Sequence, residues 1–269
     1  MTDDLVPDDL WERVEPLLPA PPARRHRSPG RVRTPDRVAL AGIVYVLRKG
    51  VAWRDVPAML IGCSGVTSWR RLRDWTRAGV WPRLHQVLLT ELRTAGKLEM
   101  DDCPIDGSHI RALKGGRDVG PSPVDRARPG SKHHVIVDRH GTPLAVSLAG
   151  GNRHDVTELI PLLDAIPPIP GLRGRPRSRP KRLFADRGYD FDKYRRLLWK
   201  RGIKPVIARR GAPHGSGLGR TRWVVERTFA WFHQFKRLRI RYERRADLHQ
   251  GLLELACSII CLRRLRKAF

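Results

Sequence analysis

The first 98 residues have the pattern of helices. The spacing of apolar and polar positions predicts helices over residues 8–18 and 36–49. A Pro-rich, basic stretch at 19–35 separates the two predicted helices. The helical pattern dominates up to about residue 98. We therefore expect residues 1–98 to form a helical domain with the 19–35 stretch as its linker.

Within this region, residues 53–60 and 66–77 are predicted helices on either side of a glycine-containing break at 62–65. This arrangement resembles a helix-turn-helix. The second helix carries arginines that suit a DNA groove or backbone: Arg70, Arg71, Arg73 and Arg77. A basic helix face exposed to solvent explains them equally well, so the segment alone leaves both interpretations open.

From Cys103 onward the pattern changes to short apolar runs typical of strands, alternating with helices. Runs on either side of 138–141 predict a β-hairpin. In chain order the predicted elements are a strand at 104–110, hairpin strands within 132–149, a helix at 155–166, a strand ending at Asp186, a helix at 191–201, a strand at 204–208, and helices at 221–238 and 247–266. The region 99–269 should therefore be an α/β domain.

The net charge of the chain indicates the class of molecule that it binds. Lysine and arginine number 53 against 27 acidic residues, a formal net charge of +26, which indicates a polyanion. The longest apolar run, 256–262, is too short to span a bilayer, and the acidic N-terminus lacks a signal region, so we expect an intracellular protein that binds nucleic acid. The four cysteines lack paired spacing, and neither zinc nor a disulfide framework is indicated.

Two acidic residues lie in or at the end of apolar strands, where a carboxylate needs a partner. Asp106 lies in Pro-Ile-Asp-Gly-Ser-His-Ile, and Asp186 ends Leu-Phe-Ala-Asp at the carboxyl end of a strand, where α/β proteins place ligands. Taken singly, each aspartate is explained equally well as a turn cap or as the partner of a nearby arginine.

Glu226 is the only acidic residue between Asp192 and Glu243, a stretch rich in arginine and lysine. At helical spacing it shares a face with Arg222, His233 and Arg237. An ion pair one turn apart, from Arg222 to Glu226, is the alternative explanation and would contribute only a few tenths of a kcal/mol.

Three carboxylates on two strand ends and a later helix are what a two-metal phosphoryl-transfer site requires. Mg²⁺ takes oxygen ligands and keeps water molecules, one of which becomes the nucleophile. We therefore expect Asp106, Asp186 and Glu226 to hold two Mg²⁺ ions, with Mn²⁺ as a substitute, and nearby arginines to hold phosphates.

The three acidic segments also resemble a known family. Ile-Asp-Gly-Ser-His-Ile at 105–110, Ala-Asp-Arg-Gly-Tyr-Asp at 185–190 and Arg-Trp-Val-Val-Glu-Arg-Thr-Phe-Ala-Trp-Phe at 222–232 are similar to DDE transposases of bacterial insertion sequences, of the insertion-sequence-five type. The similarity extends to 242–247 and to the N-terminal segment 53–57. It implies a ribonuclease-H-like mixed-sheet core with catalytic residues Asp106, Asp186 and Glu226.

Some positions depart from the family pattern or leave alternatives. Asp138 and Asp155 are reserve candidates for the second acid, although a turn and a helix N-cap explain them better. Related enzymes carry Tyr, Arg, Glu and Lys along the glutamate helix, whereas Gly219 and His233 stand here at the Tyr and Lys positions. The residues expected to contact DNA are Arg70, Arg71, Arg73, Lys132, Arg209, Arg210, Arg222, His233, Lys236 and Arg237. The short glycine-rich segment at 211–219 leaves no room for an inserted domain.

The implied reaction is metal-dependent hydrolysis at the ends of the element, followed by attack of the freed 3′-hydroxyl on target DNA. The implied partners are the element's terminal inverted repeats, target DNA and a second copy of the chain, in a dimer or larger assembly associated with the bacterial nucleoid in the cytoplasm. Two alternatives are a transposase-derived protein that binds DNA without cutting it and a nuclease that cuts without joining. The presence of all three acids speaks against the first.

Overall fold

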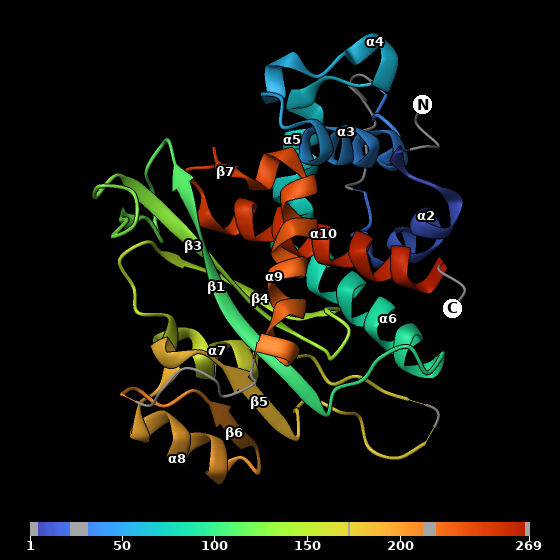
Figure 1. Ribbon diagram of the computed structural model, residues 1–269. Coiled ribbons are helices and arrows are strands. Elements are labelled where there is room, and N and C mark those ends of the chain that lie inside the picture. Colours follow the sequence, from blue (N-terminus) through green and yellow to red (C-terminus); the bar gives the residue numbers. More distant parts are fainter. Residues whose placement is uncertain (1–4, 22–31, 172, 212–218, 267–269) are drawn as a thin grey trace.

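The computed structural model describes residues 5–21, 32–171, 173–211 and 219–266 (Figure 1). Most of the predicted linker at 19–35 and most of the glycine-rich loop at 211–219 lie outside these ranges. Within them, no helix is both long and apolar enough to cross a bilayer.

The N-terminal region is helical, as predicted. Its elements are α2 (Asp8–Val14), η1 (Glu15–Leu17), α3 (Asp36–Lys49), η2 (Trp53–Asp55), α4 (Ala58–Ile61), α5 (Gly65–Arg77) and α6 (Val80–Thr94). Helix α3 has the predicted bounds and ends at Gly50, whose left-handed φ of 73° suits glycine. Helix α5 begins after Ser64, whose hydroxyl accepts a hydrogen bond from the Thr67 amide.

The continuous helix predicted at 53–60 is wrong. The segment forms a single 3-10 turn and the four-residue helix α4, with Pro57 at the junction. Helix α5 packs most extensively against α3, and the contact is close: a Cβ at Gly42 would lie 2.1 Å from the Ser68 hydroxyl oxygen. The pair α3 and α5 is therefore separated by a long connection instead of a tight turn, and a role of α5 in DNA binding stays a prediction.

The sheet confirms the predicted ribonuclease-H-like mixed architecture. Its main strands are β1 (Asp102–Ala112), β3 (Pro129–Val137), β4 (Pro143–Gly150), β5 (Arg182–Ala185) and β6 (Lys204–Ile207), in the spatial order β4-β3-β1-β5-β6. Strand β3 is antiparallel to β1 and to β4, whereas β5 and β6 run parallel to β1. The short strands β2 (Gly120–Pro121) and β7 (Ile240–Arg241) pair with the first residues of β3 and the last residues of β1, respectively.

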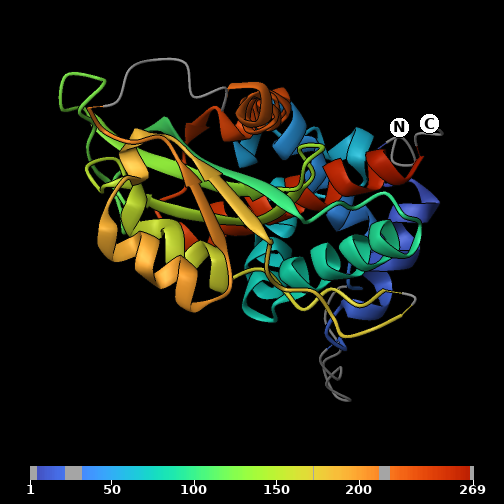
Figure 2. The ribbon, with the colours of Figure 1, turned by 60° about the horizontal axis from the view of Figure 1, so that its bottom comes forward.

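Helices lie on both faces of this sheet. Helix α9 (Gly219–Gln234) crosses one face over β1, while α7 (Leu159–Asp164) and α8 (Asp192–Lys200) lie on the opposite face (Figures 1 and 2). The remaining helical elements are the 3-10 turns η3 (Asp155–Glu158), η4 (Arg187–Tyr189) and η5 (Lys236–Leu238) and the helix α10 (Ala246–Arg266). The helix predicted at 155–166 is thus a 3-10 turn followed by a short α-helix.

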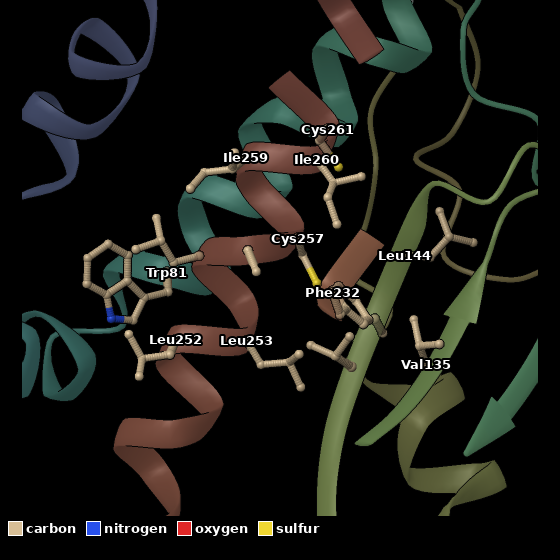
Figure 3. Packing of buried hydrophobic residues seen from close by; sticks show 14 of the residues in the cluster. Trp81, Val135, Leu144, Phe232, Leu252, Leu253, Cys257, Ile259, Ile260 and Cys261 are labelled. Carbon is tan, nitrogen blue, oxygen red and sulfur yellow. The ribbon is translucent and has the colours of Figure 1, made fainter. Parts of the chain in front are cut away.

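Helix α10 joins the N-terminal helices to the sheet. It is buried on nearly all sides over residues 251–262 and packs against α6 on one side and β4 on the other. Figure 3 shows Cys257 and Leu253 pointing towards Phe232 of α9 and the strand residues, while Trp81 of α6 lies on the opposite side of the helix. One hydrophobic cluster therefore runs from the N-terminal helices into the sheet, and the boundary predicted at residue 98 stays a prediction.

Glu254 is the acidic side chain that α10 carries within this buried stretch. Burial raises its pKa to about 7, against a partly compensating hydrogen bond from Gln250. Since the folded pKa lies above the ordinary value, the native state loses stability as the pH rises from about 4.5 to 7. We expect Glu254→Gln to be more stable than the wild type at pH 8 by on the order of 1 kcal/mol, and no more stable at pH 5.

Thermal unfolding at the two pH values measures this effect. Glu12→Gln on the exposed side of α2 serves as the control. Equal stabilisation by Glu254→Gln at both pH values would contradict the assignment of the effect to a buried carboxylate.

Candidate active site

The parallel pairing of β1 and β5 brings two of the predicted acids together. Pro104 pairs with Phe184 in the register, and Asp106 and Asp186 each lie two residues further along. The two carboxylates therefore stand at the same height on neighbouring strands. The Asp106 side chain is 19% exposed and that of Asp186 is 43% exposed, so the pair forms the floor of an open site.

Arg222 of α9 lies between these carboxylates. Its Nη2 is 2.9 Å from Asp106 Oδ2 and 3.9 Å from Asp186 Oδ2. The other carboxylate oxygens bind backbone amides: Asp106 Oδ1 accepts from Gly107 N and Asp186 Oδ1 from Gly188 N, each at 2.8 Å. The predicted alternative, in which Arg222 pairs with Glu226 one turn away, is not the arrangement found, because the guanidinium reaches across to the strands.

Burial and charge act in opposite directions on Asp106. Burial raises its pKa to about 6, with the nearby charge of Asp186 adding to the rise, while Arg222 and the Gly107 amide oppose it. A cation binds the ionised form of a carboxyl group. We therefore expect Asp106 to bind a cation more strongly as the pH rises and its carboxyl group ionises.

Glu226 lies on the outer surface of α9, one turn beyond Arg222. In the part of the chain that the structure describes, its carboxylate is exposed and makes no hydrogen bond or ion pair. Helix α9 contacts both β1 and β5, which places Glu226 on the element that crosses the two aspartates. Among the described residues, no group of three acidic, histidine or cysteine side chains is close enough to hold one metal ion.

The residues nevertheless suit a divalent cation. Hard cations such as Mg²⁺ prefer carboxylate oxygens, and the two Oδ2 atoms already face a single positive group, the Arg222 guanidinium. Arg222 thus stands where a cation would neutralise both carboxylates.

The two reserve acids have structural roles. Asp138 is fully buried in the β3–β4 turn and accepts backbone hydrogen bonds from His140 and Thr142, as a turn-forming aspartate does. Asp155 is not the predicted N-cap, because that position belongs to His154. Its carboxylate forms an ion pair with Lys132 at 2.8 Å.

Two buried polar side chains near the acids were not predicted from the sequence to belong to the site. Neither the Tyr189 hydroxyl nor the ring nitrogens of His134 have a hydrogen-bond partner among the described residues. Burial raises the Tyr189 pKa, and the charges of Asp106, Asp155 and Asp186 raise it further. Tyr189 belongs to the Ala-Asp-Arg-Gly-Tyr-Asp motif, which is the signal that could have found it, whereas nothing in the strand pattern singles out His134.

The predicted DNA-contacting residues of α5 differ in their surroundings. Arg70 is exposed and lines a hollow of about 700 Å³ beside α4. Arg71 forms an ion pair with Asp36 of α3 at 2.9 Å, and Arg73 pairs with the neighbouring Asp74. Arg70 is therefore the arginine of the three without such an ion pair in the described chain.

In the catalytic region, Arg209 and Arg210 are exposed, and Arg210 stacks over the Phe191 ring at 4.3 Å. Arg210 and Lys132 line a hollow of about 590 Å³ that also includes Asp155 and Gly188. Lys132 itself is buried by its ion pair. The basic hollow thus adjoins Asp186 through Gly188.

The placement of Arg237 on the face of Glu226 is wrong. Helix α9 ends at Gln234, and Arg237 turns inward in η5, where it is 4% exposed and binds Glu243 at 2.6 Å. Arg237 therefore lies in the interior, and we no longer expect it to contact DNA. His233 is half-buried at the end of α9, and Lys236 is exposed beyond it.

Comparisons with known proteins agree on one family. A model described as "Transposase DDE domain" matches residues 98–261, and one described as "Putative transposase of IS4/5 family" matches residues 6–85. The chain is 63% identical over 150 residues to the "Putative transposase for insertion sequence element IS402" of Burkholderia cepacia, covering 56% of this chain and 71% of that protein. It is 49% identical over 124 residues to a 16.2 kDa protein of the same element, covering 46% of this chain and 84% of that protein.

Among solved structures, the Mos1 strand transfer complex is similar at a TM-score of 0.31 and 13% identity, over 92% of this chain and 82% of that chain. A TM-score this low carries no weight in assigning the fold, which rests on the strand order and on the sequence matches.

Proposed function

The chain belongs to the DDE transposases of bacterial insertion sequences, and on that premise we propose that Asp106, Asp186 and Glu226 are the acids with which it cuts and joins DNA. Members of this family are enzymes that cleave DNA and transfer the cut strand with the help of a divalent metal ion. The observation that carries the residue assignment is the convergence of Asp106 Oδ2 and Asp186 Oδ2 on one positive group beneath the helix that bears Glu226.

Each residue has a distinct task in this proposal. Asp106, in the middle of β1, and Asp186, just after the end of β5, would hold the metal, and Glu226 would complete the site from α9. Two Mg²⁺ ions, replaceable by Mn²⁺, would activate the attacking water or 3′-hydroxyl and stabilise the leaving oxygen. The backbone amides of Gly107 and Gly188 fix the two aspartates, so that their remaining oxygens face the site.

The charge distribution supports binding of the DNA backbone beside these acids. Lys132, Arg209, Arg210, Arg222, His233 and Lys236 belong to the catalytic region and are proposed to hold phosphates around the site. Arg210 and Lys132 adjoin Asp186 through the basic hollow. We assign the ends of the element and the target DNA as the two DNA substrates.

The test is a cleavage and joining assay on a duplex carrying the element end, with Mg²⁺ and the full chain. Cleavage followed by strand transfer is the expected result. Binding without cleavage would support the DNA-binding alternative, and cleavage without joining would support the nuclease alternative. Either of these outcomes would overturn the proposed function.

Residues 1–98 are proposed to read the element end through α5. We expect Arg70→Gln to weaken end binding and to reduce the dependence of binding on salt by about one phosphate contact. Arg71→Gln should instead act mainly on stability, because it breaks the ion pair with Asp36. Fluorescence anisotropy at several salt concentrations measures DNA binding by both variants, and thermal unfolding measures the stability of Arg71→Gln. An unchanged salt slope in Arg70→Gln would exclude α5 as the reader.

Joining requires both element ends in one complex, so we also propose that the chain acts as a homodimer or larger assembly on DNA. Its substrate is bacterial DNA, which suits action at the nucleoid in the cytoplasm. Sedimentation of the protein with and without an end duplex tests the assembly.

A further inference from the structure

We propose that Arg222 is a built-in counterion that makes metal loading depend on DNA binding. In the free protein its guanidinium holds Asp106 and Asp186, and a DNA phosphate draws it away so that the metal can bind. This inference rests on the proposed function of the two aspartates. It adds an order of binding, DNA before metal, and a residue that enforces it.

The aspartate oxygens that are free of backbone hydrogen bonds are the ones that Arg222 contacts. Asp106 Oδ1 and Asp186 Oδ1 each accept a backbone amide at 2.8 Å. The two Oδ2 atoms both lie near the same Arg222 Nη2, at 2.9 and 3.9 Å. A divalent ion held by these Oδ2 atoms would therefore compete with Arg222 for them.

Electrostatic repulsion opposes binding of a metal ion while Arg222 contacts the aspartates. A guanidinium and a divalent cation at the same two carboxylates repel each other, and solvent screens this repulsion only in part because the Arg222 side chain is 20% exposed and that of Asp106 is 19% exposed. Arginine stays charged at any pH of interest, so deprotonation cannot relieve the repulsion. Metal binding consequently requires the guanidinium to move.

Arg222 uses few of its hydrogen-bond donors in the site. Its contact with the aspartates is made through Nη2 alone, and its Nε is buried without a hydrogen-bond partner among the described residues. A guanidinium that binds a phosphate through two parallel hydrogen bonds is better satisfied than this one. A phosphate placed at the acids offers Arg222 that stronger partner.

Coupling of this kind acts in both directions. If DNA removes Arg222 from the aspartates and thereby raises metal affinity, then the metal raises DNA affinity by the same factor. Without a DNA phosphate at the site, Arg222 stays on the aspartates, the protein binds metal weakly, and DNA is not cut.

The experiment compares Mn²⁺ binding to the full chain without DNA in the wild type, Arg222→Gln and Arg222→Lys. We expect Arg222→Gln to bind Mn²⁺ at least tenfold more tightly than the wild type, and Arg222→Lys to stay near the wild type because it keeps the charge. Arg227→Gln is the matched control on α9, since Arg227 stacks between Trp223 and Trp231 and touches neither aspartate. Electron paramagnetic resonance of free Mn²⁺ gives the affinities.

A second readout is DNA binding with and without Ca²⁺, measured by anisotropy on the end duplex. Ca²⁺ should tighten binding by the wild type and should lose this effect in Arg222→Gln. Thermal unfolding checks that each variant is folded, and stabilisation of Arg222→Gln by Mn²⁺ gives an independent measure of the site.

The outcomes separate the two proposals. If Asp106→Asn removes a Mn²⁺ site but Arg222→Gln binds no more tightly than the wild type, the counterion role is wrong and the metal site stands. If no Mn²⁺ site depends on Asp106, with or without duplex, the metal site fails and the counterion role fails with it.

Discussion

Glu226→Gln is expected to reduce DNA cleavage by about a thousandfold or more while leaving the fold and DNA binding close to those of the wild type. A metal ligand that stabilises charge in the transition state contributes several kcal/mol, and about 4 kcal/mol corresponds to a thousandfold in rate. Stability should change little, because the carboxylate is exposed and makes no ion pair or hydrogen bond within the described chain. A large loss of activity at an exposed residue with no structural contacts is the signature of a catalytic role.

The measurement is the rate of strand cleavage on an element-end duplex in Mg²⁺, alongside the dissociation constant for the same duplex. Glu12→Gln, an equal charge change on the exposed side of α2, is the control and should cleave at the wild-type rate. Substantial residual cleavage by Glu226→Gln would remove Glu226 from the active site and leave the third acid to be found elsewhere.

Glu243→Ala is expected to destabilise the protein by about 3–5 kcal/mol, the usual result of breaking a buried ion pair. Glu243 is 6% exposed and binds the buried Arg237 through Nη2 at 2.6 Å and Nε at 2.9 Å. Its other oxygen meets His249, whose ring in turn contacts His133 at 2.8 Å. Removal of the carboxylate leaves the Arg237 charge uncompensated in the interior between η5 and α10.

The same group gives the protein a pH dependence at the acid end. Burial opposes ionisation of Glu243, but the His249 hydrogen bond and the Arg237 charge outweigh it and lower the pKa to about 2. Because the folded pKa lies below the ordinary value of 4.5, the stabilisation is complete above about 4.5 and is lost as the pH falls towards 2.

Urea unfolding of the wild type and Glu243→Ala at neutral pH measures the difference. Asp247→Ala is the matched control, since Asp247 pairs with Arg245 on the surface, with both side chains more than a third exposed. That pair should contribute less than about 1 kcal/mol. Equal losses in the two variants would mean that burial does not set the value of the Glu243 pair.

Asp106 and Asp186 stand out in the sequence because each charge interrupts or ends an apolar run. The prediction that both lie at strand ends is wrong for Asp106, which lies in the middle of β1, and the parallel register of β1 and β5 is what places it beside Asp186. Helices with long, regular apolar patterns were also predictable: α3 has the predicted bounds, and α10 begins one residue earlier than predicted.

The failures arise where tertiary contacts override local pattern. The prediction that Arg237 shares a helix face with Glu226 required α9 to continue past residue 237. The helix instead ends at Gln234, and Arg237 forms an ion pair with Glu243. The pairing of Arg222 with Asp106 and Asp186 could not be predicted from the sequence either. Arg222 is four residues from Glu226, so the local pattern favours a pair between these two residues equally well. The contact with Asp106 spans 116 residues and depends on the sheet register.

The position of α10 also bears on how the protein is made. Ribosomes release the α6 helix and the β4 strand long before residues 246–266, and those two elements share α10 as a packing partner. Until residues 246–266 have been synthesised, the apolar surfaces of α6 and β4 that pack against α10 lack this partner. We therefore expect a product that stops before residue 246 to be less stable than the full chain and to be a target for proteolysis.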